Sequence, residues 1–103
     1  MYKNLASQKL AVYARNVVTD QPATGDAANI TAAISKDGGA TAPTNDANPT
    51  ELSAASHPGI YLFDVLQAET NADLVVVNAV SSTANIQIEP VIIYTHPLGG
   101  HIR

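Results

Sequence analysis

Alternating hydrophobic and polar residues predict β-strands at two places in the first third of the chain. One pattern extends from position 8 to 18, and the other from 30 to 35. Successive side chains of a strand point to opposite faces, so each pattern predicts a strand with one buried face. The alternating hydrophobic positions are Leu10, Val12 and Ala14 in the first strand and Ile30, Ala32 and Ile34 in the second.

Longer hydrophobic runs predict strands in the second half. Positions 60–65 are hydrophobic on both faces, which indicates a central strand, and 74–80 are rich in β-branched residues. Positions 86–95 predict the longest strand, in which Pro90 marks a bulge, a bend or an edge position because it has no N–H to donate. Two short strands are expected near Ala40 and over 50–54, between turn-forming residues.

Turn signals separate these strands. Asp37-Gly38-Gly39 predicts a tight hairpin, since glycine adopts positive φ without steric cost. His57-Pro58-Gly59 predicts a turn before the central strand. Positions 66–73 favour a single helical turn that crosses between sheets, and the Asp73 carboxylate is expected to accept backbone N–H bonds there and fix the crossover.

The fold class that follows is all-β: an antiparallel, Ig-like β-sandwich of about seven strands with one short helical crossover turn. Residues 8–95 form the expected domain, with an N-terminal arm at 1–7 and a flexible tail at 96–103. Tyr61 and Phe63 share one face of the central strand. We expect them in the core, and the alternative is an exposed pair that stacks against a sugar.

Composition suggests a surface that is meant to be covered. Charged residues make up 14% of the 103 residues, against about 25% in ordinary soluble domains. An Ala- and Thr-rich surface without a partner is the alternative explanation. The net charge of −4 and the scarcity of basic residues argue against nucleic-acid binding.

The few basic residues are unevenly distributed. Lys3, Lys9 and Arg15 occur in the first fifteen residues without an acid among them, whereas all nine acids follow later. Such an arm could dock on an acidic neighbour, including a second copy of the chain, or could belong to an ordinary first strand with solvated charges. Together with Tyr94 these three cations are the candidate assembly residues.

Candidate chemistry is sparse. The chain has no cysteine, so disulfides and thiolate chemistry are excluded. The three histidines, His57, His96 and His101, lie in expected turns or the tail, and no Gly-x-Ser-x-Gly motif accompanies them. Four aspartates could hold calcium, or could simply form turns: Asp37, Asp46, Asp64 and Asp73. We therefore expect a non-enzymatic protein without cofactor or metal.

The sequence also lacks a signal-peptide-like or membrane-spanning hydrophobic run, which predicts a soluble protein made in a cytoplasm that does not contact membrane. Five segments in their order resemble a family of small β-sandwich proteins of tailed bacteriophages. These segments are GDAANITA at 25–32, SKDGGA at 35–40, NPTEL at 48–52, PGIYLFD at 58–64 and QAETNADL at 67–74.

The resemblance extends over roughly 9–94 and implies a virion or tail-associated protein. It implies structural roles for the motifs: Asp37-Gly38-Gly39 would form the hairpin, Gly59 and Tyr61 the beginning of a core strand, and the segment that ends at Asp73 the crossover. The expected function is a multi-copy capsid decoration, neck, tail or baseplate component, homo-oligomeric or bound to other virion proteins. The alternative is a host- or glycan-binding module displayed on the particle.

Overall fold

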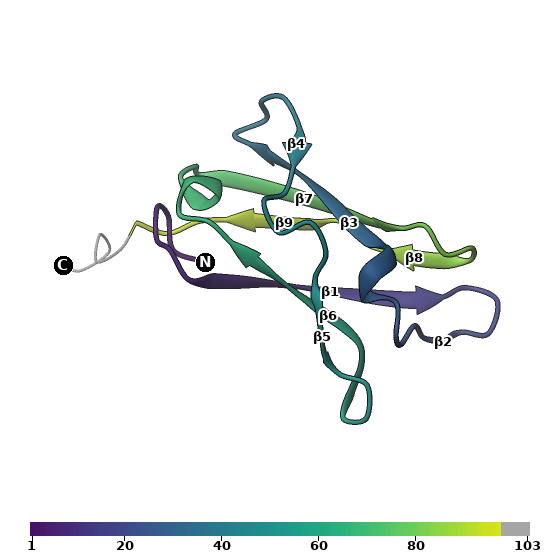
Figure 1. The fold of residues 1–103 in the computed structure, drawn as a ribbon. Coiled ribbons are helices and arrows are strands. Elements are labelled where there is room, and N and C mark those ends of the chain that lie inside the picture. Colours follow the sequence, from purple (N-terminus) through teal and green to yellow (C-terminus); the bar gives the residue numbers. More distant parts are fainter. Residues whose placement is uncertain (98–103) are drawn as a thin grey trace.

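The computed structural model describes residues 1–97 and shows two antiparallel β-sheets packed face to face (Figure 1). The sandwich class predicted from the sequence is confirmed. The first sheet contains β1 (Gln8–Asn16), β2 (Gln21–Pro22), β5 (Thr50–Ser53), β6 (His57–Val65) and β8 (Ile86–Ile88). The second contains β3 (Ile30–Lys36), β4 (Ala42–Pro43), β7 (Leu74–Ser81) and β9 (Val91–Tyr94).

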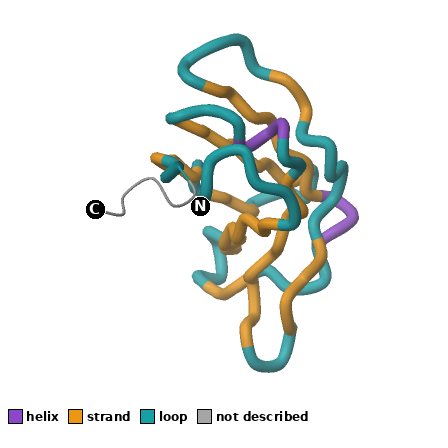
Figure 2. The backbone as a smooth tube through the Cα atoms, turned by 90° about the vertical axis from the view of Figure 1, so that its left-hand side faces the viewer, coloured by secondary structure: helices purple, strands orange, loops and turns teal. Residues whose placement is uncertain are grey.

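The described part of the chain thus has nine strands rather than about seven, because the two-residue strand β2 was not expected and the strand expected over 86–95 is divided into β8 and β9. Strand order is β2-β1-β6-β5 in the first sheet, where β8 also pairs with β1, and β4-β3-β7-β9 in the second. The β3–β4 and β5–β6 hairpins protrude from opposite sides of the body (Figures 1 and 2).

The core lies between the sheets. Burial alternates along β1 and β3, as predicted, and also along β6 and β7, for which continuous hydrophobic runs were the sequence signal. Inward-facing side chains of β1, β3, β6 and β7 are almost completely buried, while their neighbours in each strand face solvent. The buried hydrophobic residues of these strands are Leu10, Val12, Ala14, Ile30, Ala32, Ile34, Tyr61, Phe63, Val75, Val77 and Ala79.

The expected hairpin and crossover are both present. Asp37 and Gly38 have φ values of 53° and 74°, and the Gly39 N–H donates to the Lys36 carbonyl at 2.9 Å. This turn leads from β3 to β4. The helical turn expected over 66–73 is the 3-10 helix η2 (Ala68–Thr70), which connects β6 in the first sheet to β7 in the second.

Two predicted boundaries are wrong. His57-Pro58-Gly59 does not form a turn but begins β6, and the chain reverses before it, at 54–56. Gly59 keeps a positive φ of 82° inside the strand, at the point where the neighbour of β1 changes from β6 to β2. Gly59 lies there against Tyr13, the Ala14 carbonyl and Pro22. The glycine is therefore needed for close packing within a strand and does not mark a turn.

The single strand predicted over 86–95 is two strands in different sheets. β8 pairs with β1, and after Glu89 and Pro90 the chain crosses to pair with β7 as β9. Pro90 cannot contribute an N–H to either ladder, so the break occurs where one hydrogen bond is already absent. The bend was among the expectations for Pro90, but the change of sheet was not.

The segment expected as an N-terminal arm is attached to the sandwich. Tyr2 forms a parallel bridge with His96, and the Asn4 N–H donates to the Thr70 carbonyl at 3.0 Å. The side chain of Met1 packs against the core. Of the expected tail, the residues from 98 onward lie outside the described part.

Candidate assembly surface

The outer face of the second sheet is uncharged. Pairing of β3 with β7 and of β7 with β9 places alternate residues of the three strands side by side on this face. None of them is acidic or basic. They are Thr31, Ala33 and Ser35 from β3, Leu74, Val76, Asn78 and Val80 from β7, and Ile92 and Tyr94 from β9.

Several of these side chains are hydrophobic and exposed to solvent. The exposed fraction is 55% for Val80, 62% for Ile92 and 72% for Tyr94, and Leu74 and Val76 between them are half-buried. Tyr94 was expected as an assembly residue. The others were missed, although the signal was present: β7 and β9 are hydrophobic at both alternating positions, and one of the two faces has no second layer over it.

A shallow groove adjoins this face beneath the β3–β4 hairpin. Its volume is about 370 Å³, and its lining mixes methyl groups with hydroxyl and amide groups. The side chains that line it come from β3, β4 with the residue before it, and β7: Thr31, Ala32, Ala33, Thr41, Ala42, Pro43, Asn78 and Val80. The groove therefore extends the uncharged face to the edge formed by β4.

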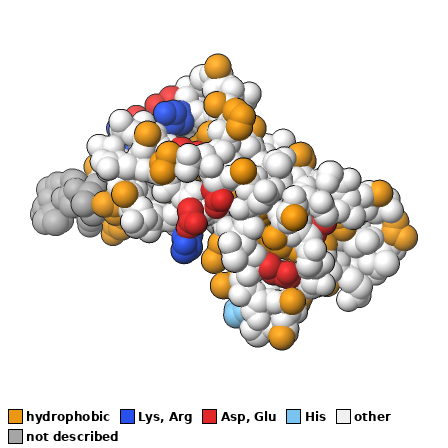
Figure 3. Space-filling model, viewed as in Figure 1, with side chains coloured by type: hydrophobic (Ala, Val, Ile, Leu, Met, Phe, Trp, Pro, Cys, Tyr) orange, Lys and Arg blue, Asp and Glu red, His pale blue; other side chains and the backbone are white. Residues whose placement is uncertain are grey.

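The three cations considered for assembly each have a partner within the chain. Lys3 pairs with Asp73 at 3.0 Å, Lys9 pairs with Asp64, and Arg15 pairs with Asp20. These pairs are exposed, so each contributes about 0–1 kcal/mol to stability. On the face seen in Figure 3, charged side chains form small separate groups rather than one continuous basic or acidic area.

The carboxylate that fixes the crossover belongs to Asp37 rather than to Asp73. One Asp37 oxygen accepts the backbone N–H groups of Asp73 and Leu74, both at 3.0 Å. The Asp73 carboxylate accepts from Lys3 instead. Glu69 on η2 adds two further bonds of the same kind, from the backbone N–H groups of Leu66 at 2.9 Å and Asn45 at 3.0 Å.

The four aspartates considered for calcium form two pairs. The Asp73 N–H donates to Asp37, and the Asp64 N–H donates to Asp46 at 2.8 Å. Within residues 1–97 the structure contains no group of three or more His, Asp or Glu side chains arranged to hold a metal ion. Each pair is accounted for by the backbone hydrogen bond that its carboxylate accepts.

Asp26 is the one acidic residue classed as buried within residues 1–97, and both of its carboxylate oxygens accept hydrogen bonds. It lies before the 3-10 helix η1 (Ala27–Asn29) and accepts bonds from Ser81, Thr83 and Asn29. Burial alone would raise the pKa of Asp26, but these three bonds together lower the pKa below its ordinary value. Asp26 thus joins the segment before β3 to the end of β7 through hydrogen bonds with Asn29, Ser81 and Thr83.

Tyr61 and Phe63 face the core, as expected, with exposed fractions of 0% and 2%. The Tyr61 hydroxyl donates to the Ala23 carbonyl at 2.7 Å and accepts the Asp26 N–H at 3.0 Å. Burial raises the pKa of Tyr61, against a lowering by the Asp26 N–H, and the nearby Glu51 and Asp26 carboxylates raise it further. The pair therefore presents no surface against which a sugar could stack.

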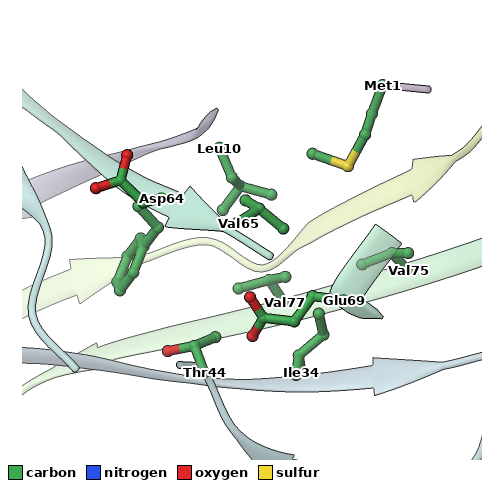
Figure 4. Close-up of a pocket in the computed structure, with 10 residues that line it drawn as sticks. Met1, Leu10, Ile34, Thr44, Asp64, Val65, Glu69, Val75 and Val77 are labelled. Carbon is green, nitrogen blue, oxygen red and sulfur yellow. The ribbon is translucent and has the colours of Figure 1, made fainter. Parts of the chain in front are cut away.

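The gap between the sheets near Met1 is filled by hydrophobic side chains (Figure 4). Leu10, Val65, Val75 and Val77 surround a space of about 10 Å³, which is at the lower limit for a single water molecule. The gap is a feature of core packing and has no room for a ligand.

The described histidines are exposed, as expected. His57 lies at the beginning of β6 beside the Ser56 hydroxyl at 3.3 Å, and His96 follows β9. His101 lies outside the described residues. No helix within residues 1–97 has the length and hydrophobicity needed to span a membrane. No family model, curated protein or solved structure matches the chain.

Proposed function

We propose that the protein is a non-enzymatic structural component of a tailed-bacteriophage particle, present in many copies on the capsid or in the neck, tail or baseplate. The observation that carries the proposal is the uncharged outer face of the second sheet, with Val80, Ile92 and Tyr94 largely exposed. Exposed hydrophobic groups gathered on one face are typical of interaction surfaces. The resemblance of five sequence segments to phage β-sandwich proteins supplies the setting.

Assembly in many copies suits a surface of this kind. Each contact through a small hydrophobic face is weak, but a particle that presents many equivalent sites turns weak contacts into stable attachment. The surface would be covered in the particle, and the protein would be made in the host cytoplasm before incorporation. No catalytic step is needed for this role.

The test is to purify phage particles from cells that produce the chain and to measure its copy number in them by quantitative mass spectrometry. A full set of symmetry-related copies, located by cryo-electron microscopy, is the expected result. Tyr94→Asp should lower the copy number, whereas Lys9→Ala, on the opposite face of the sandwich, should leave it unchanged. Particles that lack the chain would overturn the proposal.

A host- or glycan-binding module is the alternative. Tyr61 and Phe63 are buried and cannot stack against a sugar, so this alternative would depend on the exposed tyrosines, Tyr2, Tyr13 and Tyr94, or on the loop aspartates. A glycan array with the purified protein measures it directly.

A further inference from the structure

The outer strands of the two sheets differ in how their free edges are protected. β2 and β4 have two residues each and contain Pro22 and Pro43, the register of β5 shifts along its length, and β8 ends just before Pro90. Very short strands, prolines and bulges are devices that prevent a free edge from pairing with another chain. β9 follows Pro90 directly, but its own four residues, Val91–Tyr94, contain no proline, are β-branched or aromatic and uncharged, and pair with β7 without a register shift.

On its outer side, β9 has backbone groups that no strand within residues 1–97 pairs with. The Thr95 N–H donates to the Asp73 carbonyl at 3.0 Å, on the side of β7. In an antiparallel ladder the backbone groups of successive residues point to alternate sides. The N–H and C=O groups of Ile92 and Tyr94 therefore point away from β7, toward the free edge, and their side chains lie on the uncharged outer face.

The N-terminal segment closes this edge beyond Tyr94. The His96 N–H donates to the Met1 carbonyl at 3.1 Å, and its carbonyl accepts the Lys3 N–H at 2.7 Å. Tyr2 thus occupies the place of a neighbouring strand next to His96. A strand added to β9 has to stop before this point, which restricts it to the part of the edge from Pro90 to Tyr94.

We infer that β9 pairs with β9 of a second copy of the chain, antiparallel about a two-fold axis. The four-stranded second sheets of the two copies would then join into one continuous sheet. The pairing is confined to 90–94 in both copies, and Ile92 is the middle residue of this segment. The two-fold axis therefore passes beside Ile92, and Ile92 faces Ile92 of the second copy. The N–H of Tyr94 then donates to the carbonyl of Pro90 in the second copy. This hydrogen bond uses only the carbonyl of the proline, so its missing N–H does not prevent it.

A second copy is the occupant that this edge suits. Antiparallel pairing of identical strands is self-complementary, as a two-fold contact requires. Like charges that face each other across a strand pair are destabilising, and neither β9 nor the outer face beside it carries any. The inference rests on the proposed function for its biological setting, and it names the contact between neighbouring copies.

The absence of cysteine in the chain allows a sharp test by cross-linking. Paired residues at a hydrogen-bonded position lie about 5.5 Å apart between Cα atoms, within the range of about 4.4–6.8 Å that a disulfide spans. Ile92→Cys, mildly oxidised in the purified protein, should therefore give a covalent dimer. Val80→Cys is the matched control, since Val80 is 55% exposed on the same face but lies in β7, away from the edge.

Light scattering on the chain without cysteine gives the second readout. The wild-type protein should form dimers as its concentration rises. Ile92→Lys should remain monomeric, because it places two like charges opposite each other, and circular dichroism should show that it is folded. A wild-type monomer at the highest soluble concentration, a dimer unaffected by Ile92→Lys, or equal cross-linking at positions 80 and 92 would each overturn the inference.

Failure of the pairing through β9 can be distinguished from failure of the proposed function. A monomer that is still found in phage particles overturns only the pairing through β9. A dimer that is absent from particles overturns only the structural role in the particle.

Discussion

Gly59 gives the most direct test of the packing described above. Its φ of 82° is unfavourable for any residue with a side chain, and an added Cβ would lie 2.8 Å from the Tyr13 ring, 2.9 Å from the Ala14 carbonyl and 3.0 Å from Pro22. Gly59→Ala combines both penalties. Gly38→Ala is a matched control, because Gly38 has a φ of 74° but nothing within 4 Å of an added Cβ.

The two penalties are of different size. A left-handed conformation costs an alanine about 1–2 kcal/mol, partly offset by about 0.4–1 kcal/mol because alanine is less free than glycine in the unfolded chain. Gly38→Ala should therefore lose about 1 kcal/mol. At Gly59 the Ala14 carbonyl belongs to the backbone of β1 and cannot easily move, so overpacking adds about 1–3 kcal/mol. The expected loss for Gly59→Ala is about 2–4 kcal/mol.

Urea denaturation followed by circular dichroism measures the free energy of unfolding of both variants, and calorimetry gives Tm. At about 4–8 °C per kcal/mol for a domain of this size, Gly59→Ala should melt at least about 8 °C below the wild type. Gly38→Ala should melt only about 5 °C below it. If the two variants lost the same stability, the close approach of β6, β1 and β2 at Gly59 would be refuted.

Three further predictions concern hydrogen bonds seen in the structure. The pKa of Asp26 lies below the 3.8 of an unperturbed carboxyl, so its stabilising effect is complete above pH 3.8 and is lost as pH falls through the lower folded-state pKa. The difference in unfolding free energy between wild type and Asp26→Asn should therefore narrow in acid, and a pH-independent difference would contradict this. Tyr61→Phe leaves the buried N–H of Asp26 without its partner and should lose about 1–3 kcal/mol in urea denaturation, whereas an unchanged midpoint would mean that water replaces the hydroxyl. Asp37→Ala removes the acceptor of two backbone N–H groups and should lower Tm more than Asp73→Ala, which loses one exposed ion pair. The reverse order of Tm values would mean that Asp73, rather than Asp37, stabilises the crossover.

Local patterns predicted the strands whose structure is determined by nearby residues. β1 and β3 follow the alternation of their hydrophobic side chains, because burial of one face is encoded residue by residue, and β7 follows its run of β-branched residues. The hairpin after β3 was equally predictable, since Asp37 and Gly38 tolerate the positive φ of the turn. In each case the information lies within a few consecutive residues.

Features that depend on distant partners were not predictable in this way. The Asp37 carboxylate bonds to backbone groups 36 and 37 positions later, and no short-range pattern distinguishes it from an ordinary turn aspartate. Gly59 looked like a turn residue because its crowding comes from Tyr13, Ala14 and Pro22, which are distant in sequence.

The candidate assembly surface shows the same limit. The residues of β9 were expected inside one long strand, and that strand gives no sign of which sheet its second half joins. Tyr94 was noticed as a candidate from the sequence. Its placement on a free edge beside Ile92, however, depends on the pairing of β9 with β7.

The change of sheet at Pro90 makes the C-terminal strands a mechanical link between the two layers. β8 is bonded to β1 in one sheet and β9 to β7 in the other, with only Glu89 and Pro90 between them. With so short a connection, β8 and β9 cannot separate far without one of them losing its pairing. The C-terminal strands therefore hold the two layers of the sandwich together at this end.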